Sequence, residues 1–422
     1  MEKSSSSNGK ISRMVQRGFG LIRRKQTPFK VNLLKNMIQN FSLSLTQQYQ
    51  SIYITDLGAS PIELGYVNSG GGVASALVSL PLGWLATKHG IKKIFITGLL
   101  LMILGSTVFA LSRNWEITFI ALIIFMLSQR IVMTGCPLVC GHTLSNEERA
   151  TGMQLCDTLS AVPRLIAPIV AAFAISMFGG LSAEGIRPLY WIRSLGLSIS
   201  LFLIFRFFTN PSGIEHKARQ SSLMGDLRRV ISEGKIVKRW IIFATLSTFP
   251  MYIGDIFIPL YAAQMKGANE LILGWMFAAS WLLVIPLALP IGRLADAFGR
   301  AKLILLMTPI YCTSLLLLIF AWNTPSLIAS GLFKGFYMLM AVTQAAMTAE
   351  LVPKELLGSW LGMLGLFRGI VGVVSPILGG IIWENIGPEY VFYFLISIQV
   401  ARILILLTVL SSDKNKSETV KK

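Results

Sequence analysis

Long apolar runs alternate with short basic gaps along almost the whole of this 422-residue chain. Hydrophobic residues make up 53% of the sequence and charged residues 14%, whereas about a quarter of the residues in an ordinary soluble domain are charged. A helix needs about 20 apolar residues to cross a bilayer, which matches the length of the runs. Because backbone groups in lipid must bond within their own segment, we expect an all-α integral membrane protein.

Twelve runs are long enough to cross a membrane. We expect membrane spans at 33–55, 61–87, 92–111, 116–141, 150–179, 187–208, 239–265, 271–296, 301–321, 325–349, 357–383 and 388–410. Lys and Arg gather in residues 1–30 and 209–238, whereas the gaps on the opposite side carry mainly Asp and Glu. Because cytoplasmic loops are rich in Lys and Arg, we expect a multi-pass protein of the cell membrane with both termini in the cytoplasm.

The net charge of +18 follows from the same distribution of Lys and Arg over inner loops and tails. It therefore does not indicate a nucleic-acid partner. We expect the lipid bilayer to be the surface that these cations meet, since anionic headgroups attract basic segments.

One short pattern occurs twice, about half a chain apart. It reads GWLATKHGIKK at 83–93 and GRLADAFGRAK at 292–302, each in a basic gap between two apolar runs. The triplets Ala-Pro-Ile at 167–169 and Ser-Pro-Ile at 375–377 also match, in the fifth and eleventh spans. A repeat of this length indicates two related halves. Its glycines are typical of tight turns that need a positive φ angle.

The repeated pattern resembles the G-x-L-a-D-x-x-G-r signature of the major facilitator superfamily, which lies between helices 2 and 3 and recurs between helices 8 and 9. The matching residues, to which the resemblance assigns a role in conformational change, are Gly83, Gly90, Gly292, Asp296, Gly299 and Arg300. Thr87 departs from the signature, because it stands where the family has Asp.

The resemblance implies twelve transmembrane helices in two pseudo-symmetric six-helix bundles, with a solute site between them near the middle of the membrane. Spans 1, 4, 7 and 10 would line the cavity, with contributions from 2, 5, 8 and 11. The expected organisation is a basic cytoplasmic tail 1–30, a bundle 31–208, a linker 209–238, a second bundle 239–410 and a cytoplasmic tail 411–422.

Ionisable residues inside the spans are the strongest candidates for the transport site, because each is costly in lipid unless it is paired or hydrated. They are Arg130, Asp157, Arg164, Asp255, Lys334 and Arg368. Arg130 and Asp157 could equally form a buried structural pair. Asp255 could carry a proton or form a salt bridge with Lys334 or an arginine.

The first span adds polar side chains at helical spacing, among them Asn40, Gln47 and Gln48. Amides on one face of a membrane helix need water, solute or another helix as partner, and we favour the cavity. Arg193, Arg206 and Arg402 are expected nearer the helix ends, with their charged groups reaching the membrane surface.

The sequence favours secondary transport of a small solute, because a Gly-rich ATP-binding motif is missing from it. Asp255 is the candidate carrier for coupling to protons. The cavity candidates include more cations than carboxylates, which suggests an anionic solute. A proton-coupled exporter of drugs and a transporter-like membrane sensor are the alternatives. We expect no enzyme activity, cofactor or metal, since the three histidines lie far apart in loops. We expect a monomer.

Overall fold

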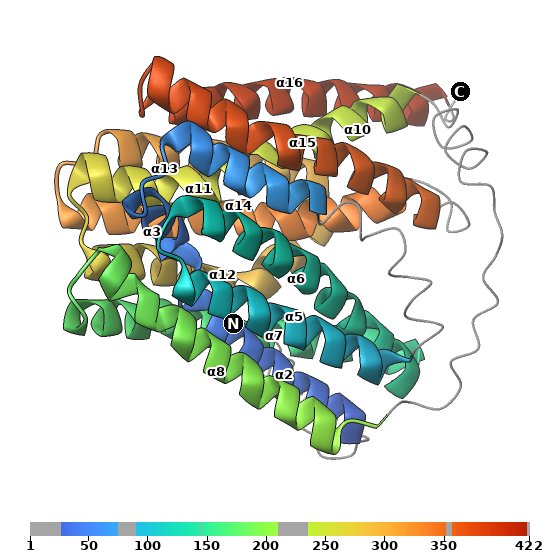
Figure 1. The fold of residues 1–422 in the computed structure, drawn as a ribbon. Coiled ribbons are helices and arrows are strands. Elements are labelled where there is room, and N and C mark those ends of the chain that lie inside the picture. The colour runs from blue at the N-terminus through green and yellow to red at the C-terminus, as the bar shows by residue number, and fades with distance from the viewer. Residues whose placement is uncertain (1–26, 75–89, 145, 210–234, 352–356, 420–422) are drawn as a thin grey trace, which may run out of the picture.

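The computed structural model describes residues 27–74, 90–144, 146–209, 235–351 and 357–419. All regular structure in these ranges is helical (Figure 1). The first signature copy from Gly83 to Thr87, most of the basic tail 1–30 and most of the linker 209–238 lie outside the described residues. The side chain of Asp296 also lies outside the described set.

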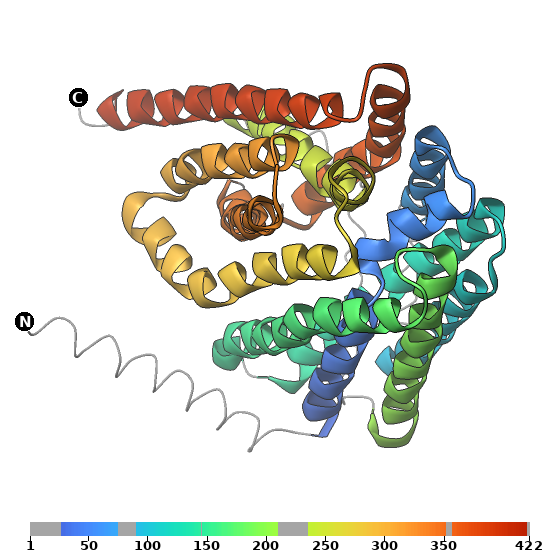
Figure 2. The same cartoon turned by 90° about the vertical axis from the view of Figure 1, so that its left-hand side faces the viewer.

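The helices form two groups that follow each other in the chain (Figure 2). The first group contains α2 (Thr27–Ser44), η1 (Gln47–Tyr49), α3 (Gln50–Asp56), a helix at 61–74, α5 (Ile91–Leu111), α6 (Trp115–Thr143), α7 (Asn146–Met177) and α8 (Ala183–Phe207). The second contains α10 (Lys235–Leu246), α11 (Phe249–Lys266), α12 (Glu270–Phe298), α13 (Arg300–Ile319), α14 (Thr324–Glu350), α15 (Leu357–Asn385) and α16 (Tyr390–Thr419). We call these the N-terminal and C-terminal halves.

Ten segments of the described chain are long and apolar enough to span a membrane. They correspond to the third through twelfth expected spans. The first expected span is the broken segment α2–η1–α3, and the second begins as helix 61–74 and continues into residues outside the description. The chain is therefore a multi-pass membrane protein with the expected helical architecture. At its end, α16 extends beyond the expected span to Thr419.

Two spans expected to be continuous are interrupted. The first stops at Ser44 and resumes as the short helix η1, and the seventh stops at Leu246 and resumes at Phe249. Pro250 explains the second interruption, because proline lacks an N–H and its ring clashes with the carbonyl four residues earlier. At the first interruption the Thr46 hydroxyl donates to the Leu43 carbonyl at 3.3 Å, a local bond that competes with regular helix.

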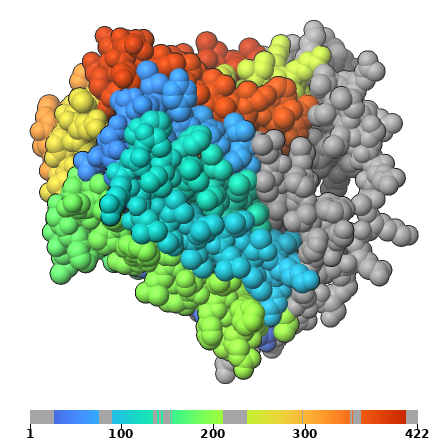
Figure 3. Space-filling view, in the orientation of Figure 1, coloured from blue at the N-terminus to red at the C-terminus, as the bar shows by residue number. Residues whose placement is uncertain are grey.

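The halves pack tightly at one end of the bundle, which is the left-hand end in Figure 1. This end contains the loops between α7 and α8 and between α11 and α12. A Cβ atom added to Gly274 of α12 would lie 2.8 Å from the Pro168 carbonyl oxygen of α7, and one added to Gly65 would lie 2.6 Å from that of Pro376 in α15. Helix 61–74 and α15 run side by side there (Figure 3). Glycine is required at both positions because the backbone of the opposite half fills the space.

These two contacts are related by the internal repeat. Gly65 and Gly274 each lie 18 residues before the first glycine of their signature copy, and Pro168 and Pro376 are the matching prolines of the two halves. The two halves therefore use equivalent residues of the internal repeat, a glycine and a proline from each half, for equivalent contacts with each other. We refer to this region as the closed end.

Candidate functional site

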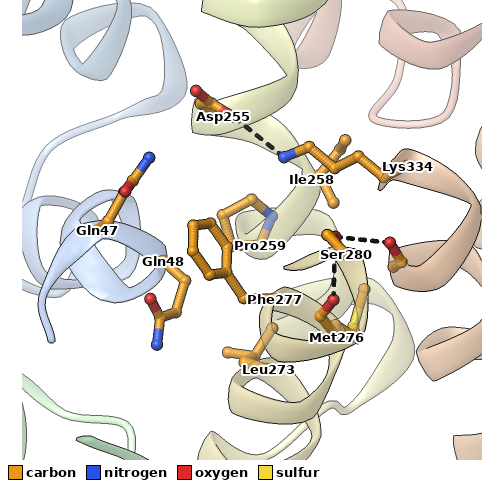
Figure 4. Close-up of a pocket in the computed structure, with 11 residues that line it drawn as sticks. Gln47, Gln48, Asp255, Ile258, Pro259, Leu273, Met276, Phe277, Ser280 and Lys334 are labelled. Carbon is orange, nitrogen blue, oxygen red and sulfur yellow. Dashed lines mark hydrogen bonds and ion pairs between the residues drawn. The ribbon is translucent and has the colours of Figure 1, made fainter. Parts of the chain in front are cut away.

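A narrow pocket lies between the halves, next to the break in the first span (Figure 4). The N-terminal half contributes Gln47 and Gln48, and the C-terminal half contributes residues of α11, α12 and α14. The remaining lining residues are Asp255, Ile258, Pro259, Leu273, Met276, Phe277, Ser280, Gly331 and Lys334. Its free volume of about 30 Å³ is room for about two waters, so a solute must widen it by moving the halves.

The amides of Gln47 and Gln48 differ in their surroundings. Gln47 is exposed, whereas Gln48 is 3% exposed; its amide lies near the Tyr49 hydroxyl, but neither amide atom makes a well-formed hydrogen bond among the described residues. Buried amides are normally hydrogen-bonded. The Gln48 amide is therefore available to water or to a polar group of a bound solute.

Asp255 of α11 and Lys334 of α14 form an ion pair across the pocket wall, with Nζ and Oδ1 3.0 Å apart (Figure 4). The lysine side chain is 14% exposed and the aspartate side chain 43% exposed. The carboxylate therefore reaches open space while it neutralises the more buried ammonium. The sequence left open whether Asp255 carries a proton or forms a salt bridge with Lys334 or an arginine. In the structure it forms the salt bridge with Lys334.

Arg164 of α7 is not part of the pocket lining, but it contacts the other half at Trp281, the residue after the pocket-lining Ser280. Its Nε and Nη2 atoms both donate to the Asn40 Oδ1 atom, at 2.9 and 2.6 Å. The guanidinium carbon lies 5.0 Å from the ring centroid of Trp281 on α12, in the other half. Asn40 is itself oriented by donation from its Nδ2 atom to the Asn36 carbonyl at 2.7 Å. Arg164 thus has a neutral hydrogen-bond partner and an aromatic neighbour.

Asp157 lies two turns before Arg164 on α7, is exposed and interacts electrostatically with it. Arg130 of α6 is exposed as well. On α15, Arg368 is partly buried and lies within electrostatic range of Tyr252 and Tyr337. The structure therefore brings Arg164 together with Asn40 and within electrostatic range of Asp157, and it pairs Asp255 with Lys334.

Two of the signature glycines have the positive φ that the sequence predicts, whereas Gly292 lies inside helix α12 without one, and Gly83 lies outside the described residues. Gly90 has φ 78° and begins α5, and Gly299 has φ 93° and separates α12 from α13. Positive φ is readily available only to glycine. Gly292 has no neighbouring atom within 4 Å of an added Cβ, and Arg300 starts α13.

The prediction that Arg193 and Arg402 reach the membrane surface is wrong. Both are 1% exposed, so their charged groups pack inside the bundle instead of reaching outward to the membrane surface. Arg193 stacks over Phe125 at 3.8 Å and Arg402 over Phe243 at 4.6 Å. Their burial follows from packing against broken spans of the same half, which helix periodicity alone does not reveal. Arg206 is exposed, as expected for a surface-reaching arginine.

Sequence reasoning missed the aromatic and amide residues around the charges. Trp281 contacts Arg164, the Tyr337 hydroxyl donates to the Ser247 carbonyl at 2.6 Å, and the Gln344 Nε2 atom donates to the Ser247 hydroxyl at 2.9 Å. The sequence does not single out Trp281 as a site residue, because tryptophan is common in apolar membrane spans. Pro250 did mark the break that exposes the Ser247 carbonyl.

Comparisons with known proteins agree with this architecture. The profile of the Major Facilitator Superfamily matches residues 36–273 and 241–422. Multidrug resistance protein 2 of Bacillus subtilis is 20% identical over 88% of this chain and 92% of its own. The riboflavin transporter RibZ of Clostridioides difficile is 29% identical, but the match spans 40% of this chain and only 38% of that protein.

Among solved structures, the nucleoside transporter NupG superposes with a TM-score of 0.74, covering 91% of this chain and 99% of its own at 14% sequence identity. That likeness concerns the fold. Together with the profile match over both halves, it agrees with the repeat, the helical spans and the pocket between the halves. The chain is a membrane transporter and belongs to the Major Facilitator Superfamily.

Proposed function

We propose that this protein is a secondary active transporter that moves a small anionic solute by alternating access. The observation that supports the proposal most directly is the pocket itself, which lies between the halves and has an ion pair in its wall. A solute held there would face one side of the membrane or the other as the halves rock about it.

The balance of charge favours an anion. The ionisable residues inside the spans comprise four cations, Arg130, Arg164, Lys334 and Arg368, and two carboxylates, Asp157 and Asp255. Because Lys334 already neutralises Asp255, the remaining groups carry an excess of positive charge. The planar guanidinium of Arg164 donates to a neutral amide, so it can also hold a carboxylate or phosphate group without breaking an ion pair.

We propose that Asp255 is the residue that couples transport to protons. Its carboxylate is the exposed member of the ion pair, so it can exchange a proton with water in the pocket. Protonation would release Lys334 as a second cation for the solute. Anion binding and proton uptake would then support each other, since each offsets the charge that the other introduces.

The distribution of basic residues along the chain supports an orientation of the protein in the membrane. We propose that both termini are on the cytoplasmic side of the cell membrane, because Lys and Arg gather in residues 1–30 and 209–238 and cytoplasmic loops are rich in these residues. The closed end would then face the outside. Each chain contains both pocket walls, so we propose that a monomer is sufficient for transport.

The test is a transport screen with purified protein in proteoliposomes, using matched aromatic compounds that carry a carboxylate, an amide or an amine. Uptake is measured with and without a pH gradient and compared with protein-free liposomes. We expect uptake of the carboxylate member, driven by the gradient. Uptake of the amine alone would overturn the anion assignment, and no uptake by any member of a broadened screen would contradict secondary transport.

Export of drug-like cations is the second candidate, because Leu273, Met276 and Phe277 give the pocket an apolar wall. Multidrug resistance protein 2, whose name refers to drug resistance, aligns with most of this chain. In that case Asp255 would bind the cationic group. The amine compound in the screen separates the two candidates.

A further inference from the structure

We propose that Arg193 and Arg402 are positioning residues, each of which fixes the break in a pocket-lining span of its own half. Arg193 lies on α8, the last helix of the N-terminal half, and Arg402 on α16, the last helix of the C-terminal half. Both are buried, both stack on an aromatic ring, and both are linked by hydrogen bonds to the interruption of a neighbouring span. The assignment is independent of the solute and of the coupling ion.

In the N-terminal half the link is direct. The Arg193 Nη1 atom donates to the Thr46 hydroxyl at 2.8 Å, and Thr46 is the residue between α2 and η1. Phe125 of α6 holds the guanidinium from its face, 3.8 Å from the ring centroid. Arg193 therefore joins the break in the first span to the fourth span. Gln47 and Gln48, which line the pocket, follow Thr46 immediately.

In the C-terminal half the link passes through one glutamine. The Arg402 Nη2 atom donates to the Gln344 Oε1 atom at 3.1 Å, and the Gln344 Nε2 atom donates to the Ser247 hydroxyl at 2.9 Å. Ser247 lies between α10 and α11. Arg402 also donates to Gln399 at 2.6 Å and stacks over Phe243 of α10. This arrangement fixes the start of α11, on which Asp255 lies two turns later.

The charge of these arginines is not explained by ion pairing. Among the described residues no carboxylate pairs with either one, and the Nε atoms of both lack a hydrogen-bond partner. A buried unpaired cation is unfavourable in a membrane protein, so an apolar residue of similar volume would serve packing better. What the guanidinium adds is a planar group whose face stacks on an aromatic ring while its edge donates to the residues at the break. Its occurrence at the same helix of both halves points to a role at the breaks.

The experiment uses reporters at the two breaks. The four native cysteines are replaced by alanine, and a single cysteine is introduced as Gln47→Cys or as Met251→Cys, both at exposed positions. The probe is N-ethylmaleimide, and the labelling rate is measured on the full chain in nanodiscs. Arg206→Gln is the matched control, since this arginine is exposed on the same helix as Arg193.

We expect Arg193→Gln to change the labelling rate at position 47 roughly tenfold, as expected for the loss of a hydrogen bond to a charged group, with little effect at position 251. Arg402→Gln should have the converse effect. The lysine variants, which keep the charge and a donor, should restore the rates partly, and Arg206→Gln should change neither.

Thr46→Val and Ser247→Ala remove the linking hydroxyl groups while both arginines remain, and they should reproduce the effect at their own reporter. These variants keep the test decisive if an arginine variant does not fold. Unchanged rates in Thr46→Val and Ser247→Ala would overturn the assignment. Equal changes at both reporters would also overturn it, because they would indicate general loosening of the bundle.

Discussion

The guanidinium of Arg164 in the N-terminal half stacks on the indole of Trp281 in the C-terminal half, with the guanidinium carbon 5.0 Å from the ring centroid. The contact joins α7 to α12, which also meet at Pro168 and Gly274. A residue proposed to bind the solute therefore also senses the relative position of the halves. Solute binding and domain movement can be coupled through this one side chain.

Arg164→Gln and Trp281→Leu should each destabilise the protein, and the double variant should lose less than the sum of the two. The coupling should be about 0.5–2 kcal/mol, the range of cation–π contacts from exposed to desolvated sites. Thermal unfolding in detergent measures all four proteins of the cycle. Strict additivity would show that the stacking contributes nothing to the association of the halves.

The ion pair in the pocket predicts that removing one of its charges destabilises the protein more than removing both. Lys334→Met leaves the Asp255 carboxylate without its cation and should cost about 1 kcal/mol, a low value because the carboxylate is partly hydrated. The double variant Lys334→Met/Asp255→Asn removes both charges and should be more stable than Lys334→Met alone. Thermal unfolding distinguishes these outcomes. A double variant less stable than either single variant would contradict the pairing as described.

Asp255→Asn should also separate binding from proton coupling. We expect uptake in proteoliposomes to lose its stimulation by a pH gradient, whereas exchange of labelled for unlabelled solute across the membrane should continue. The reason is that exchange needs the halves to move with solute bound but needs no net proton transfer. Gradient-driven uptake that persists in this variant would assign the proton to another group.

The close contacts at the closed end predict a shift between conformations. Gly274→Ala places a methyl group 2.8 Å from the Pro168 carbonyl, which the halves can accommodate only by separating there. Spin labels at Met177 and Trp322, exposed positions in the two halves, should report longer distances in this variant. Gly365→Ala, where an added Cβ meets nothing within 4 Å, is the control. An unchanged distance distribution in Gly274→Ala would mean that the contact yields locally.

The second signature copy should be more sensitive than the first. Gly299→Val forces a β-branched residue into φ 93° and should impair transport while the protein still inserts. Asp296→Asn should impair transport as well. Thr87→Ala should have a smaller effect, since the acid of the signature is replaced there. Equal damage from Thr87→Ala and Asp296→Asn would contradict this difference, and membrane-fraction yield controls for insertion.

Much of the fold was predictable because lipid imposes a simple rule on the chain. Apolar length locates the spans, and the repeat at Gly90 and Gly299 locates equivalent turns, both of which have positive φ. Ionisable residues inside spans pointed to Asp255 and Lys334 because their cost demands a partner. Their pairing required the structure, since several cations were available to Asp255 in the sequence.

The sequence could not show the depth and surroundings of Arg193 and Arg402. Position within an apolar run does not tell whether an arginine reaches the surface or packs under an aromatic ring. The answer depended on Phe125 and Phe243, which lie on other helices. The break at Thr46 was equally hidden, because no proline or glycine accompanies it.

The central claim is that Arg164 binds the anionic group of a transported solute between the halves. The direct measurement is the KM for uptake, in proteoliposomes, of the carboxylate compound selected by the screen, with Arg164→Gln compared against wild type and Arg206→Gln. We predict a KM raised about tenfold or more by loss of charge-assisted hydrogen bonds, with uptake of the matched amide compound little changed. An unchanged KM for the carboxylate compound in a folded Arg164→Gln protein would contradict the claim.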